Sequence, residues 1–201
     1  MTAQENNLYS LVPLDEFKAI LGIDDRDDKI ARFCLVTSTF TIEQYCKRRL
    51  LRKKHFERIE YMGDLVLPLR EYPVSGVLAV YTLSGTGGTG EIVEPEFYHV
   101  IPDCGSNEDF PFSVELSPAF ARMGCKAIKV IYFAGYNKGA VPTELAAACL
   151  ELASWNMNRY RGRRVGMTGN IRGAGKEGEH FEMSMPENVK ALLEPYRRKT
   201  I

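Results

Sequence analysis

The apolar residues of this 201-residue chain change their spacing twice, and this change constrains the fold more than any other sequence feature. Towards both ends of the chain, apolar residues recur every three or four positions, as on one face of an α-helix. Between residues 55 and 133 they form short runs rich in β-branched and aromatic residues, separated by proline and glycine. The pattern predicts β-strands placed between two sets of helices.

Two helices are predicted before the strands. The first is short, because Pro13 opens it and Gly22 follows it as a stop signal. The second follows the acidic run at residues 24–28, which we interpret as helix-capping residues, and extends to about Arg49. The expected buried faces consist of residues spaced three or four apart: Leu14, Phe17 and Leu21 in the first helix, and Ile30, Phe33, Thr37 and Phe40 in the second.

Two more helices are predicted after the strands. Pro142 suits the first turn of the third helix, and Pro186 opens a last helix that stops before Pro195. The third helix has apolar residues at spacings of four and three, and we expect Trp155 to form the centre of the core. The predicted core residues are Phe17, Phe33, Leu145, Leu152 and Trp155.

The middle of the chain predicts an antiparallel β lobe, with strands in LVLPL, VLAVYTL, EFYHVI, FSVEL and AIKVIYF. The predicted fold class is therefore α+β, a helical core with an inserted antiparallel β lobe. We expect one compact domain overall, with N-terminal helices in residues 1–54, the β lobe in 55–136 and C-terminal helices in 137–201. The last part includes a flexible glycine- and arginine-rich arm at residues 162–185.

Composition excludes several classes of protein. Apolar residues make up 45% of the chain and charged residues 26%, the balance of a folded globular protein. No apolar run approaches the roughly 18 to 20 residues that cross a bilayer, and the N-terminus does not resemble a signal peptide, so no membrane partner is expected. Five widely spaced cysteines form no ligand pattern, and we expect them to be reduced.

No catalytic, cofactor-binding or metal-binding residue is predicted. The GTGGTG stretch at residues 85–90 fits a dinucleotide-binding pattern, but strand-like residues follow it where that site needs a helix. The acidic run at 24–28 lacks the spacing of a calcium-binding loop. The three histidines lie far apart, and no nucleophile motif is present. These absences lead us to expect a protein that is not an enzyme.

Charge is segregated along the chain, although 26 basic and 26 acidic residues cancel. Residues 47–54 carry six basic groups, and residues 159–176 carry six more without an acidic one. Such stretches occur on solvated surfaces, on surfaces that bind DNA phosphates and on surfaces that bind an acidic neighbouring subunit. The candidate interface or DNA-contact residues are Arg159, Arg161, Arg163, Arg164, Arg172 and Lys176.

Five segments follow one another along the chain in a characteristic order: LDEFKAILGIDDRDDKI, TIEQYCKRRLL, LPLREYPVSGVLAVYT, IKVIYFAGYNKGAVPTELAAACLELASWNMNRYR and PENVKALLEPYRR. In this order they resemble the small head-tail connector proteins of long-tailed bacteriophages and prophages, also called head-completion or adaptor proteins. Each segment resembles a structural motif of that family, and together they cover nearly the whole chain. The glycine-rich tip at 85–90 and the arm at 162–185 depart from the family pattern.

The resemblance implies a structural subunit of a homo-oligomeric ring. Such a ring docks on the portal protein at the capsid vertex and gives a tail or stopper protein its attachment surface. The expected location is the head-tail junction of the virion, reached from the bacterial host cytoplasm during assembly, with transient contact with packaged DNA. The alternative is a DNA-binding module that uses the arginine-rich segment at 159–176, which predicts salt-dependent binding by the monomer.

Overall fold

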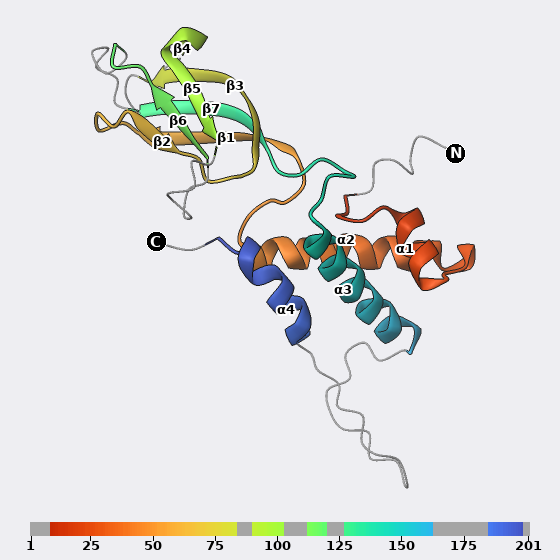
Figure 1. The fold of residues 1–201 in the computed structure, drawn as a ribbon. Coiled ribbons are helices and arrows are strands. Elements are labelled where there is room, and N and C mark those ends of the chain that lie inside the picture. Colours follow the sequence, from red (N-terminus) through yellow and green to blue (C-terminus); the bar gives the residue numbers. More distant parts are fainter. Residues whose placement is uncertain (1–8, 84–89, 103–111, 120–126, 163–184, 199–201) are drawn as a thin grey trace. The chain divides into compact units, whose positions relative to one another are not determined.

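The computed structural model describes residues 9–83, 90–102, 112–119, 127–162 and 185–198 (Figure 1). The chain divides into two compact units, a helical unit built from residues up to 48 and from 138 to 198, and a β unit built from residues 49–137. This confirms the α+β class, with strands inserted between helices. Residues 49–137 form a compact unit of their own, whereas the sequence predicts one compact domain overall.

The helical unit contains the four predicted helices. They are α1 (Leu14–Leu21), α2 (Asp28–Cys46), α3 (Thr143–Arg161) and α4 (Glu187–Leu193), with short 3-10 turns η2 (Asp25–Asp27) and η5 (Glu194–Tyr196). Helix α2 packs against α1, α3 and α4, and α3 packs against α4 (Figure 1). None of the helices among the described residues is both long enough and apolar enough to cross a lipid bilayer.

The ends of the first two helices are set by residues with positive φ. Gly22 ends α1 with a φ of 62°, and its N–H donates to the carbonyl of Lys18, as the sequence predicts. Lys47 ends α2 with a φ of 55°, and the Arg48 N–H then donates to the Glu43 carbonyl over 3.2 Å. Helix α2 therefore stops at Cys46, three residues before the predicted end.

The buried face of α2 is not the predicted one. Phe33 and Phe40 are 50% and 43% exposed, and the face that packs inwards is made mostly of small residues. Small side chains let two helix backbones approach closely, and Thr39 contacts Cys149 of α3 with 3.8 Å between oxygen and sulfur. The buried residues of α2 are Ala31, Cys34, Leu35, Ser38, Thr39, Ile42, Glu43 and Cys46.

Three of the five predicted core residues are confirmed. Phe17, Leu145 and Leu152 are at most 2% exposed. Phe33 is wrong, because it lies on the outer side of α2 and meets Tyr160 edge-on at 5.5 Å. Trp155 is also wrong as the centre of the core, because it is half-buried. The buried stripe of α3 continues through small and flexible residues beyond Leu152, namely Ala153 and Met157.

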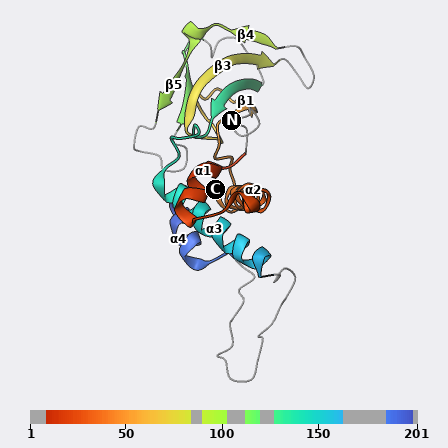
Figure 2. The same cartoon turned by 90° about the vertical axis from the view of Figure 1, so that its right-hand side faces the viewer.

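The β unit consists of two antiparallel sheets. The first has the order β1 (Lys53–Glu60), β7 (Ala127–Ala134), β3 (Val74–Leu83), β4 (Glu91–Val93), and the second has the order β2 (Val66–Pro68), β6 (Phe112–Leu116), β5 (Tyr98–Pro102). All five predicted strand runs are confirmed, and β1 and β4 are additional. Register shifts interrupt the pairing of β3 with β7, and β3 is curved (Figure 2).

The two sheets enclose a separate hydrophobic core. Ile128, Val130 and Tyr132 of β7 are at most 1% exposed and pack in one cluster with Leu67 of β2 and Val114 of β6. The Tyr132 hydroxyl donates to Glu57 over 2.8 Å and accepts from the Glu71 N–H over 3.2 Å. Burial and the Glu57 carboxylate together raise the pKa of Tyr132, so its hydroxyl stays protonated and serves as a fixed donor.

A backbone clamp closes the base of the β unit. The Arg52 N–H donates to the Tyr136 carbonyl over 2.9 Å, and the Tyr136 N–H donates to the Leu50 carbonyl over 2.7 Å. Gly135 makes this possible, because it has a φ of 103° and a Cβ there would lie 2.6 Å from the Leu51 carbonyl carbon. The chain therefore leaves the β unit beside the point where it came in.

We predict that Gly135→Ala destabilises the β unit far more than Gly63→Ala. Gly63 has a φ of 100° but nothing within 4 Å of its Cβ position, so alanine there bears only the backbone strain of about 1–3 kcal/mol. At Gly135 the collision with the backbone of Leu51 and Arg52 adds to the same strain. Urea denaturation of both variants measures the difference, and equal free energies of unfolding would contradict the clamp.

Candidate functional site

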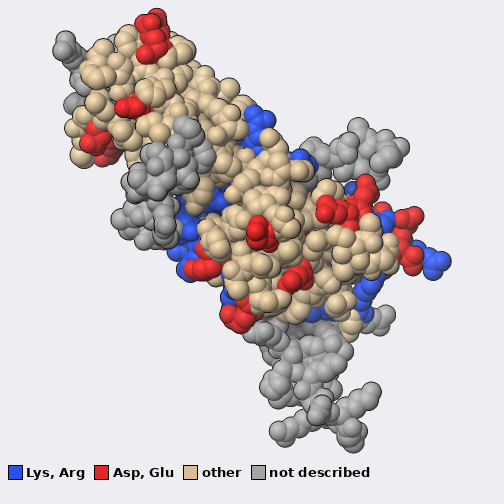
Figure 3. Space-filling model, viewed as in Figure 1, with Lys and Arg blue, Asp and Glu red and all other residues tan. Residues whose placement is uncertain are grey.

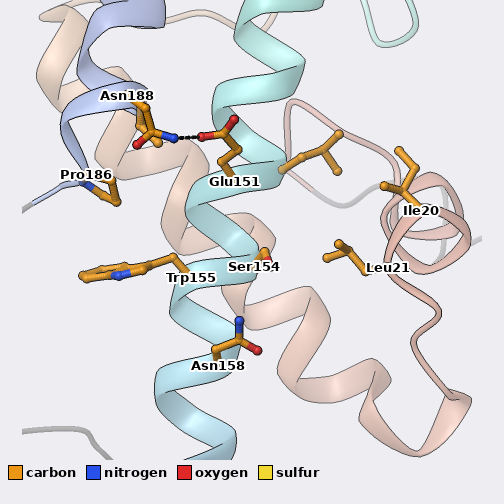
Figure 4. Close-up of a pocket in the computed structure, with 10 residues that line it drawn as sticks. Ile20, Leu21, Glu151, Ser154, Trp155, Asn158, Pro186 and Asn188 are labelled. Atoms are coloured by element: carbon orange, nitrogen blue, oxygen red, sulfur yellow. Dashed lines mark hydrogen bonds between the residues drawn. The ribbon is translucent and has the colours of Figure 1, made fainter. Parts of the chain in front are cut away.

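The described part of the helical unit contains an open groove of about 510 Å³ along the outer side of α3 (Figure 4). The end of α1 forms one wall and the start of α4 forms the other, while α3 passes between them. Its main lining residues are Ile20, Leu21, Ser154, Trp155, Pro186 and Asn188.

The α1 wall of the groove is apolar and exposed. Ile20 and Leu21 are 55% and 40% exposed, although Leu14 and Phe17 of the same helix are buried. Apolar side chains of α1 therefore contact the core in its first turns and line the groove in its last turn. Leu21 was predicted for the buried face, and the structure corrects this, because Leu21 is the last residue of the helix and lines the open groove.

The other side of the groove is built around the single tryptophan of the chain. Figure 4 shows Trp155 below Pro186 on one side of α3, with Ser154 on the opposite side, next to Leu21. The Arg159 guanidinium lies over the Trp155 ring, with 4.6 Å from its central carbon to the ring centroid. Tryptophan and arginine are the residue types enriched where protein interfaces gain most of their binding energy. This half of the groove therefore has the residue types of a protein-binding site.

Polar side chains fix the spacing of the groove walls. Asn188 of α4 donates a hydrogen bond to the Glu151 carboxylate of α3, as the dashed line in Figure 4 shows. The Tyr45 hydroxyl of α2 donates to Glu194 over 2.8 Å, and this bond raises the pKa of Tyr45. Helix α4 is thus held to α3, and the turn η5 that follows it is held to α2.

The predicted interface residues separate into three groups. Arg159 lies at the groove, stacked on Trp155. Arg161, the last residue of α3, instead forms an ion pair with Asp27. The remaining four lie outside the described residues: Arg163, Arg164, Arg172 and Lys176. Most of the predicted arm, residues 163–184, and most of the glycine-rich tip, residues 84–89, also lie outside them.

The acidic run beside the groove does not cap helices through its side chains. Asp24 and Asp27 occupy N-cap positions without a side-chain hydrogen bond, which corrects the sequence prediction. Asp25 and Asp28 instead accept hydrogen bonds from Lys18 of α1. The Lys18 ammonium lowers the pKa of Asp25, and the two carboxylates raise the pKa of Lys18. Figure 3 shows a group of acidic side chains at the right-hand end of the helical unit, where α1 lies in Figure 1.

The described cysteines are buried and unreactive. Cys34, Cys46 and Cys149 are free thiols with 0% exposure, and burial raises the pKa of each to about 11. Within the described ranges, no group of three or more His, Cys, Asp or Glu side chains is placed to hold a metal ion. The expected absence of catalytic and metal sites stays a prediction.

Comparison with known proteins gives matches in structure alone. No family model and no curated protein sequence matches the chain. A chain in the neck of an empty gene transfer agent (GTA) particle, computed with C6 symmetry, superimposes with a TM-score of 0.62 at 20% identity, covering 100% of this chain and 95% of that one. The fold is shared. The likeness spans both units, so the β unit is part of the common architecture.

Two further structures show the same likeness. A chain in the virion of the native GTA particle has a TM-score of 0.59 at 20% identity, covering 95% of this chain and 91% of that one. A chain in the neck of the native GTA particle, computed with C12 symmetry, has a TM-score of 0.58 at 19% identity, covering 100% and 94%.

We predict that Trp155→Ala destabilises the helical unit less than Leu152→Ala does. Leu152 is 2% exposed, so its truncation leaves a closed cavity and costs about 2–5 kcal/mol. Trp155 is partly exposed and lines an open groove, so its truncation widens that groove and removes, among its contacts, the one with Arg159, which contributes about 0.5–1 kcal/mol. Thermal and urea denaturation measure both, and equal losses would place Trp155 in the core after all.

Proposed function

We propose that the chain is a structural, non-catalytic subunit of a ring in the neck of a phage or phage-like particle. The observation that carries the proposal is the likeness in fold over the whole chain to chains in GTA particles, two of them in necks. The sequence resemblance to head-tail connector proteins supports it independently, because it rests on residues and not on the backbone.

A closed ring requires two different binding surfaces on each subunit, and this chain has exposed apolar surface in more than one place. The two GTA necks were computed with C6 and C12 symmetry, so their copies repeat around an axis. In a closed ring, each subunit uses one surface to bind a different surface of the next copy. The described part of this chain offers exposed apolar surface at the groove, on Ile20 and Leu21, and elsewhere on Phe56 and Ile92.

The proposed ring docks on a portal protein and offers an attachment surface to a tail or stopper protein. The groove around Trp155 is our candidate for the portal-binding surface. The Trp155 half of the groove, opposite Ile20 and Leu21, combines an aromatic anchor and Pro186 with a rim of Glu151, Asn158 and Arg159. This is the arrangement of a small interface with an apolar centre and a polar rim. Portal binding therefore requires no chemistry beyond shape and apolar contact.

Two of the six residues proposed for DNA contact, the two that the structure describes, are engaged within the chain, which argues against the DNA-binding alternative. A phosphate-binding arginine needs its guanidinium available, but Arg161 is paired with Asp27 and Arg159 lies over Trp155. A connector also has reason to bind DNA weakly, because the genome moves past it during packaging and ejection. We expect DNA binding no tighter than the roughly 10⁻⁴ to 10⁻⁶ M of non-specific contacts.

We predict that the purified chain forms closed rings, alone or together with the portal protein encoded by the same genome. Sedimentation velocity and negative-stain electron microscopy over a range of concentrations measure this. Trp155→Ala should weaken portal binding at least tenfold without unfolding the chain. Met62→Ala is the matched control, because Met62 is 83% exposed, belongs to the β unit and does not line the groove.

One combination of results would contradict the connector proposal. A chain that forms no ring and binds no portal at any concentration, and whose monomer binds duplex DNA with nanomolar affinity at physiological salt, would overturn the connector proposal. Replacing Arg161, Arg163 and Arg164 with alanine would then remove about three phosphate contacts and reduce the salt dependence of binding accordingly.

A further inference from the structure

The four-stranded sheet of the β unit has one face against the core and one face exposed. Residues that alternate along β7, including Ile128, Val130 and Tyr132, are buried against the second sheet. On the opposite face, Phe56 of β1 and Ile92 of β4 are 62% and 66% exposed. Single exposed apolar side chains are common, but several on one sheet face indicate an interaction surface. We call this the outer sheet face.

The strand register shows which residues share the outer sheet face. Residues that pair directly across antiparallel strands point to the same side. Lys54 pairs with Phe133, Phe56 pairs with Ile131, and Arg58 pairs with Lys129. The row through Lys129 continues across the sheet to Tyr81 and Ile92. These three rows combine apolar side chains with the cations Lys54, Arg58 and Lys129. The next row adds one carboxylate, Glu60 opposite Ala127, so positive charge still prevails on this face.

The cations on this face are held over the aromatic rings. The ammonium groups of Lys54 and Lys129 lie 5.2 and 5.7 Å from the centroid of the Phe56 ring. The guanidinium of Arg52 lies 4.7 Å from the centroid of the Phe133 ring. Nucleic-acid platforms leave aromatic faces open for stacking by bases. Here cations occupy those faces, so the surface fits carboxylates set among apolar side chains better than it fits bases.

The described part of the same chain carries a surface with that complementary chemistry. Residues 15–29, from α1 to the start of α2, contain six acidic and three basic residues. Ile20 and Leu21 are exposed within this segment, and so is Asp24. We call residues 15–29 the acidic end of the helical unit. This surface carries carboxylates together with exposed aliphatic side chains. Its charge is opposite to that of the outer sheet face, and both surfaces expose apolar side chains.

We propose that the outer sheet face of one copy binds the acidic end of the next copy, and that this contact is the repeating interface of the ring. The proposal rests on the proposed function, since it assigns the contact by which that ring closes. The two surfaces differ, as a head-to-tail contact requires. Opposite charge on the two partners also fixes which surfaces meet and speeds their encounter.

A pair of neighbouring lysines provides the test. Lys54 lies on the outer sheet face, whereas Lys53 pairs with the buried Ala134 and so points to the other side of the sheet. Both are exposed in the edge strand, so Lys53→Glu makes the same change in charge as Lys54→Glu at almost the same place. We expect Lys54→Glu to weaken self-association at least tenfold in sedimentation equilibrium, and Lys53→Glu to change it less than threefold.

The reciprocal change tests the partner surface. Asp24→Lys should weaken self-association as Lys54→Glu does, because it places positive charge opposite the basic sheet. The chain that carries both substitutions should recover, and so should a mixture of the two single variants, because either one can then alternate with the other around an even-numbered ring. Circular dichroism on each variant checks that both units stay folded.

Three outcomes would overturn the inference in distinguishable ways. If wild type forms rings and Lys54→Glu assembles as well as Lys53→Glu, the interface lies elsewhere while the proposed function stands. If both single variants are impaired but their mixture and the double variant do not recover, the two surfaces do not meet. If wild-type monomer binds single-stranded DNA and Lys54→Glu abolishes this binding, the occupant of the sheet face is nucleic acid.

Discussion

The rest of the structure depends on two backbone hydrogen bonds at the base of the β unit. They join Arg52 and Leu50 to Tyr136, so the chain returns to where it left the helical segments. Helices α2 and α3 are separated by almost a hundred residues in sequence, and they pack through small side chains that tolerate little displacement. Bringing the ends of such a long segment together costs entropy. A folded β unit with adjacent ends offsets part of that cost.

The surfaces of the two units differ in character, although the charges of the chain sum to zero. The described carboxylates of the helical unit concentrate around α1, where Lys18 neutralises only part of them. In the β unit, Lys54 and Lys129 lie on one face of a sheet, close to the Phe56 ring. Both surfaces also expose large aliphatic or aromatic side chains. Net charge is therefore a poor guide to the partners of such a chain, because the interaction chemistry lies in its distribution.

The order of elements could be read from spacing, because helix stops and strand runs are local signals. Gly22 ended α1 as predicted, and five apolar runs became strands. The inner face of α2 could not be read in this way. Sequence patterns weigh large apolar residues most, and Phe33 and Phe40 point outwards while Ala31, Cys34 and Ser38 point inwards. Strand β1 was missed as a strand because its exposed positions are mostly charged.

The candidate site was harder to predict than the fold. Three segments far apart in sequence form the groove, and no periodicity within one helix shows which neighbours will flank it. Trp155 was identified as important, but for the core, since its spacing from Leu152 matches the stripe of α3. The prediction for Trp155 failed because Ala153 and Met157, and not Trp155, continue the buried stripe of α3 beyond Leu152. The sequence did contain one signal of the groove. Trp155 lies at the edge of an apolar stripe, and Arg159 follows it four residues later.

The position of Trp155 also makes the groove observable without any added label. It is the only tryptophan among the 201 residues, it is half-buried, and it stands at the groove beside a guanidinium. Indole fluorescence excited at the red edge of protein absorption therefore comes from this one place. A partner that enters the groove excludes water from the ring, which shifts the emission to shorter wavelength and shields the ring from iodide quenching. The native chain thus reports in real time, by its own optical signal, when that surface becomes occupied.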